Sequence, residues 1–157
     1  MSVNGLAIAL HVLAAVVWVG GMFFAYMALR PAAGQLALAD RLALWAGVFA
    51  RFFPFVWLSV IALLATGYWL IFAVLGGMGG AGTHVHIMHG LGWLMFALFG
   101  HVYFAPWRRL RLALEAGTLN EGARYLNQIR VLIGVNLLLG LIVVAVAAGG
   151  RYGLLPG

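Results

Sequence analysis

Four long apolar stretches constrain this chain more than any other feature. They cover approximately residues 4–29, 54–75, 84–105 and 130–149. Each is long enough to cross the hydrocarbon core of a bilayer, which takes about 20 helical residues. The mean hydropathy of +1.09 lies far outside the range of soluble globular domains. The sequence therefore predicts an all-α fold, an integral membrane four-helix bundle that forms a single transmembrane domain over residues 1–157.

The segments around these stretches predict where the helices begin and end. The first stretch lacks the basic leading segment of a signal peptide, so we expect it to stay in place. Pro54 suits the first turn of the second helix, and residues 40–53 before it are apolar enough to extend that helix or to lie along the membrane surface. A glycine-rich connection predicts a loop before the third stretch, which ends at Pro106. Thr118 with Glu121 fits a capping box that opens the last helix.

The charge distribution predicts the orientation of the bundle. The net charge of +6 comes from nine arginines against three acidic residues. Because the arginines stand beside apolar stretches, they indicate topology and contact with the lipid bilayer rather than nucleic-acid binding. The two basic connections carry Arg30, Arg41 and Arg51, and Arg108, Arg109, Arg111, Arg124 and Arg130. The positive-inside rule places both connections in the cytoplasm and both termini outside.

Four histidines stand inside the apolar stretches: His11 in the first, and His86, His89 and His101 in the third. An imidazole in hydrocarbon is costly unless something pairs with it, so each histidine is a candidate functional residue or a hydrogen-bonded core residue. At about 1.5 Å of rise per residue, His11 and His89 each lie roughly 28 Å from the basic edge of their helices. His86 is one turn further out, and His101 is only roughly 10 Å from that edge. The three histidines of the third stretch share one helix face.

These histidines predict a heme site. The chain has no cysteine, which excludes iron–sulfur clusters and thiolate copper sites. Opposing histidines at similar depth are the ligands that b-type cytochromes use, so the main prediction is heme b held axially by His11 and one of His86 or His89, with electron transfer to an unidentified redox partner. Trp18 lies seven residues after His11 and is placed either to pack on the porphyrin or to form bundle core.

The alternative is copper binding and transport across the membrane. Imidazole and thioether ligands suit copper, and His84, His86, Met88 and His89 together would form an outer entry site. The remaining methionines are too scattered to form a ladder across the bilayer. A third alternative is a structural subunit in which the histidines only tie helices together.

The role of His101 stays open at this point. A second heme bound by His101 would need a second ligand from Met22, Met27 or a partner subunit. The alternatives are that His101 has no such partner, or that it only forms a hydrogen bond with Asn136. Small residues within the stretches allow helices to pack closely, leave space for a macrocycle, or allow subunits to associate in a homo-oligomer. These residues are Gly20, Gly21, Ala25, Gly90, Gly92, Gly100, Gly134 and Gly140.

Several segments carry a resemblance to a known family. The sequences LHVLAAVVWVGGMFF (residues 10–24), HVHIMHGLGW (84–93), HVYFAPWRRLR (101–111) and QIRVLIGVNLLLG (128–140) resemble the small CopD-like membrane proteins, named for copper resistance. A histidine and a Trp-x-Gly in the first stretch also resemble, more distantly, HemJ, the heme-associated protoporphyrinogen oxidase of bacteria. The resemblance implies a multi-pass protein of the bacterial inner membrane that binds heme b or copper through His11, His86 and His101.

Overall fold

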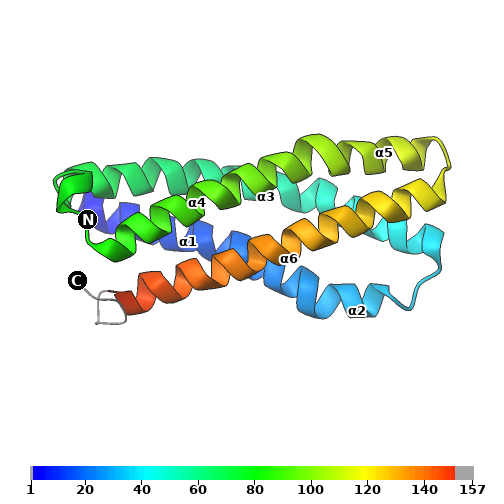
Figure 1. The fold of residues 1–157 in the computed structure, drawn as a ribbon, viewed down its shortest axis with the longest axis horizontal. Helices are drawn as coiled ribbons and strands as arrows, with labels where there is room; N and C mark the ends of the chain where they lie inside the picture. The colour runs from blue at the N-terminus through cyan, green and yellow to red at the C-terminus, as the bar shows by residue number, and fades with distance from the viewer. Residues whose placement is uncertain (1, 151–157) are drawn as a thin grey trace.

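Four long helical segments run the length of the molecule, and each is long and apolar enough to cross a membrane (Figure 1). The computed structural model describes residues 2–150, and this part of the chain is helical with short connections and no strand. The elements are α1 (Val3–Phe24), the π turn η1 (Ala25–Leu29), α2 (Arg30–Ala33), α3 (Leu38–Ala73), the 3-10 turn η2 (Met78–Gly80), α4 (Thr83–Val102), the π turn η3 (Tyr103–Trp107), α5 (Arg108–Glu115) and α6 (Leu119–Gly149). The predicted all-α, four-helix membrane fold is confirmed.

The arginine-rich connections gather at one end of the bundle. In Figure 1, α1 begins and α6 ends at the same end, and the α3–α4 connection lies there too. The α2 segment and the α5–α6 connection lie at the opposite end, which we call the basic end. This arrangement follows from an even number of antiparallel spans.

The second helix begins well before Pro54, so Pro54 does not lie in its first turn, and of the two alternatives for residues 40–53 the structure has the extended helix. Helix α3 runs without interruption from Leu38 to Ala73 and contains Pro54 in its interior, so residues 40–53 extend the helix. A proline inside a helix removes one backbone hydrogen bond. Phe49 and Phe53, just before this point, are buried and both contact the ring of Trp107 outside α3, which holds the chain helical.

The third helix also continues past its predicted end. Pro106 lies inside the π turn η3, and helix continues through α5 to Glu115. A wider turn accommodates the proline ring, which would clash with the carbonyl four residues earlier in a regular helix. Thr118 does stand at the start of α6, but its hydroxyl bonds to the Ala113 carbonyl and to Glu121 Oε2. The predicted capping box is therefore wrong in its hydrogen bonds, because no backbone N–H of α6 bonds to the Thr118 side chain.

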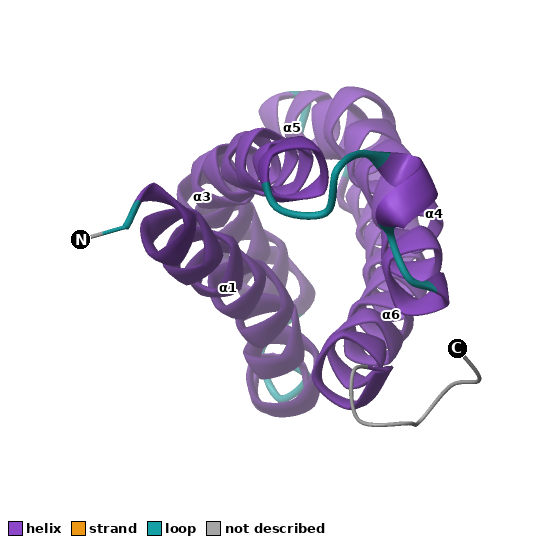
Figure 2. Ribbon diagram, turned by 90° about the vertical axis from the view of Figure 1, so that its left-hand side faces the viewer, coloured by secondary structure: helices purple, strands orange, loops and turns teal. Residues whose placement is uncertain are grey.

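The bundle consists of two helical hairpins. Viewed along its long axis (Figure 2), α1 and α3 form one side and α4 and α6 the other. Helix α1 packs chiefly against α3, and α4 packs chiefly against α6. Association of helices in a membrane depends on such side-chain packing, because the lipid is as apolar as the helices.

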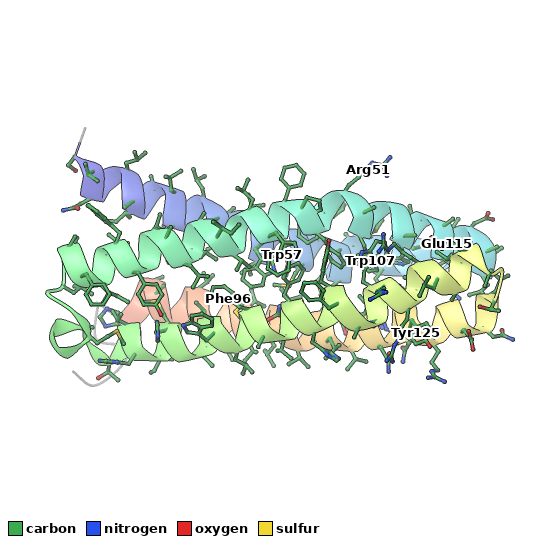
Figure 3. All side chains as sticks on the ribbon, turned by 90° about the horizontal axis from the view of Figure 1, so that it is seen from above. Arg51, Trp57, Phe96, Trp107, Glu115 and Tyr125 are labelled. Carbon is green, nitrogen blue, oxygen red and sulfur yellow. The ribbon has the colours of Figure 1, made fainter. Side chains whose placement is uncertain are left out.

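Aromatic side chains fill the space between the two hairpins. Figure 3 shows Trp57, Phe96 and Trp107 lying between the long helices, whereas Arg51 points away from them. The Trp57 ring meets Phe99 edge-on with 5.1 Å between ring centroids, and Phe96 stacks on a tryptophan of α1 at 5.6 Å. Aromatic pairs of this kind contribute about 0.5–1.5 kcal/mol each beyond the area they bury.

Some of the glycines predicted as packing residues stand at close helix contacts. A Cβ on Gly21 would overlap the ring of Phe52, and one on Gly134 would lie 3.0 Å from the ring of Tyr26. Gly140 is similarly close to its neighbours. An added Cβ would meet nothing within 4 Å at Gly20, Gly90, Gly92 or Gly100. Packing therefore accounts for only part of the glycine content.

Candidate functional site

His11 is held by a hydrogen-bond chain between two helices. Its Nδ1 atom lies 2.8 Å from Oγ1 of Thr66 on α3, and the ring is half-buried. The Thr66 hydroxyl is itself buried and donates to the carbonyl of Ala62 over 2.6 Å. This chain orients the imidazole within the first hairpin.

The same chain assigns the protonation of His11. A hydroxyl has one hydrogen to donate, and Thr66 gives it to the Ala62 carbonyl. Oγ1 therefore accepts from His11, which places a ring hydrogen on Nδ1; in the neutral imidazole the lone pair is then on Nε2. A histidine whose one nitrogen donates to a second group while the other is unprotonated has the form that metals bind.

His89 contacts the same helix by a different route. Its half-buried ring meets Tyr68 of α3 edge-on, with 5.6 Å between centroids, and the Tyr68 hydroxyl accepts from Trp93 Nε1 at 3.3 Å. Thr66 and Tyr68 are two residues apart, which corresponds to about 3 Å along the axis and about 200° around it. His11 and His89 thus lie at comparable depth, but they contact different sides of α3.

The first turns of α4 carry two further histidines, His84 and His86. His84 is half-buried against the end of α6, where a Cβ on Gly150 would overlap it, and His86 is exposed. Residues three or four apart share a helix face, so His84 pairs with the half-buried Met88. His86 pairs with His89 in the same way. Among residues 2–150, no three histidine or carboxylate side chains lie close enough together to hold a metal.

His101 lies apart from these residues. It is exposed on α4 toward the basic end and faces away from the bundle core. Asn136 is buried and donates to the carbonyl of Met95 at 3.4 Å, so the predicted hydrogen bond from Asn136 to His101 is wrong. Met22 is buried in the core and Met27 is 58% exposed.

Trp18 lies in the aromatic core. It is 2% exposed, its ring stacks on Phe96, and Phe99 meets it edge-on. Two cavities in the described part of the chain have volumes of about 600 Å³ and about 10 Å³, and neither is lined by a histidine. The smaller one borders Trp18.

These features define a multi-pass, all-helical membrane protein with histidines concentrated at one end. It belongs to the family described as copper resistance protein D, which matches residues 46–149, more than half of the chain. The match includes the histidines of α4, whereas His11 and Trp18 precede it. No curated protein and no solved structure matches the chain.

The family match confirms the CopD-like resemblance and favours one of the two cofactor predictions. Its description links the chain to copper, which was the alternative. The predictions of heme b, iron and electron transport have no support here, and neither has the likeness to HemJ. The assignments of His11, His86, His89, His101 and Trp18 to a cofactor stay predictions, as do the inner-membrane location, a homo-oligomer and a redox partner.

Proposed function

We propose that this protein binds copper at the end of the bundle that carries His11 and the first turns of α4, as a step in copper handling in the bacterial inner membrane. The observation that carries the proposal is the hydrogen-bond chain from His11 through Thr66 to Ala62. It orients an intramembrane histidine with its hydrogen on Nδ1, so that the neutral ring offers Nε2 to a metal. The family description supports copper as the metal.

The start of α4 would serve as the entry to this site. His86 is exposed and His89 lies one turn further into the bundle, so the two imidazoles form a path inward. The thioether of Met88 adds a soft ligand on the same segment. Imidazole and thioether donors suit copper, and the chain has no thiolate to compete with them.

A binding experiment with matched histidine variants tests this proposal. The purified protein in detergent is loaded with Cu(I) under reducing conditions, and its affinity is measured by competition with a chromophoric chelator. His11→Gln and the double variant His86→Gln/His89→Gln should each weaken binding by about 10-fold or more, since even outer-shell partners of a metal contribute 10–100-fold. His101→Gln is the control, because His101 is an exposed histidine far from the site, and it should bind like the wild type.

Two results would overturn the proposal. One is copper affinity that is unchanged in both His11→Gln and the double variant. The other is a purified protein with a Soret band that disappears in His11→Gln, since that band would identify the ligand of His11 as heme iron. Circular dichroism of each variant establishes that the helices are intact.

A further inference from the structure

A cavity in the described part of the chain lies at the basic end and has no histidine in its lining. It has a volume of about 600 Å³ and is lined by residues of η1, α2, α3 and α6. This size is within the range of pockets that bind small molecules. The cavity thus lies between the two hairpins, at the level where headgroups meet the arginine-rich connections.

Three arginines from three helices line this cavity. They are Arg30 of α2, Arg41 of α3 and Arg130 of α6, together with the amide of Asn127. None of the described residues that line the cavity is an aspartate or glutamate. The guanidinium carbon of Arg30 lies 4.7 Å from the centroid of the Tyr26 ring, a cation–π contact that orients it. Three like charges that line one cavity, with no acidic residue in its described lining, favour binding of an anion.

The remaining wall of the cavity is apolar. Trp45, Phe49 and Ile133 line it, and the π turn η1 contributes Ala25 and Tyr26. A π turn within a transmembrane helix is frequently found at a functional site. A small inorganic anion would leave this apolar wall without a partner. A ligand with an anionic head and an apolar tail matches both halves.

We propose that this cavity binds the phosphate-bearing headgroup of an acidic phospholipid, with the acyl chains lying along the apolar wall toward the bilayer. The planar guanidinium groups match phosphate oxygens in geometry as well as in charge. Basic pockets between transmembrane helices recognise anionic lipid headgroups in this way. The inference is independent of copper binding, because it involves none of the histidines.

Thermal unfolding with defined lipids tests the site. The full-length protein in neutral detergent is measured with phosphatidylglycerol, with phosphatidylcholine and with inorganic phosphate. At a lipid concentration near 100 times Kd, phosphatidylglycerol should raise Tm by about 5 °C or more, and phosphatidylcholine should not. The shift should be lost in Arg41→Gln/Arg130→Gln. It should persist in Arg108→Gln/Arg109→Gln, a pair of exposed arginines outside the cavity whose removal changes the net charge equally.

A second variant tests the cavity without changing charge. Ala123 lines the cavity from α6, so Ala123→Leu should obstruct it and abolish the phosphatidylglycerol shift and the lipid adduct seen by native mass spectrometry. Equal shifts in both arginine double variants would overturn the proposal, because they would show general charge attraction. An equal shift with inorganic phosphate alone would overturn the lipid assignment in favour of a free anion. If the arginine variant fails to fold, the adduct of Ala123→Leu decides the question.

Discussion

A single hydroxyl hydrogen decides what His11 offers to a ligand. Thr66 donates that hydrogen to the Ala62 carbonyl and so accepts one from the imidazole. The residue that sets the chemistry of His11 is therefore on another helix, 55 positions away along the chain. The sequence of α1 identifies His11 as a candidate, but nothing in the sequence of α3 distinguishes Thr66 from other residues of its apolar stretch.

Substitution of Thr66 should change copper affinity while leaving His11 in place. Thr66→Val keeps the shape of the side chain and removes the acceptor, so we expect copper binding to weaken by about 10–100-fold. Thr66→Ser restores the hydroxyl and should bind like the wild type. The measurement is chelator competition, as for the histidine variants. Wild-type affinity in Thr66→Val would contradict the role given to this hydrogen-bond chain.

Two neighbouring glycines of α1 illustrate how helix packing selects residues. Gly21 faces the ring of Phe52 on α3, and there is no room for a Cβ between them. Gly20 is exposed, and a Cβ there would meet nothing within 4 Å. The first glycine allows α1 and α3 to approach closely, and the second has no packing role in the described structure.

The pair gives a matched test of the hairpin contact. Gly21→Ala should lower the free energy of unfolding by about 1–3 kcal/mol, because the ring of Phe52 must move. Gly20→Ala should be neutral or more stable by up to about 1 kcal/mol, since alanine favours a helix over glycine. Equilibrium unfolding in mixed detergent measures both. Equal stabilities would mean that this contact does not limit the approach of the helices.

The position of every connection makes the orientation of the whole bundle testable. The described connections alternate between the two ends, and those at the basic end carry the arginines that predict a cytoplasmic location. Because the chain has no cysteine, a thiol reagent can label only a cysteine that is introduced, and that label reports which side of the membrane its connection faces.

Cysteine labelling should place the two ends on opposite sides of the membrane. In intact cells with a permeabilised outer membrane, a membrane-impermeant maleimide should label Gly79→Cys. Gln35→Cys and Ala116→Cys, at the basic end, should react only after lysis. All three positions are exposed, so accessibility within the protein does not decide the result. Labelling of the basic end in intact cells would reverse the predicted orientation.

The two hairpins have similar sequence patterns and different environments. Each has a tryptophan seven residues after a histidine and a proline thirteen residues after the tryptophan. The residues are His11, Trp18 and Pro31 in the first half, and His86, Trp93 and Pro106 in the second. The first tryptophan is 2% exposed and lies in the core, whereas its counterpart is 47% exposed. Equivalent local patterns therefore do not predict which histidine is enclosed by the bundle.

The four spans, the all-helical fold and the basic end followed from the amino-acid sequence, because a backbone in hydrocarbon has to satisfy its hydrogen bonds within apolar helices about 20 residues long. The continuity of α3 through Pro54 did not, because contacts from other helices hold the chain helical there. Which histidine meets Thr66, and which three arginines share a cavity, depended on how the hairpins pack. In a membrane that packing rests on shape rather than hydrophobicity, and shape complementarity between distant helices leaves no periodic pattern in a single chain.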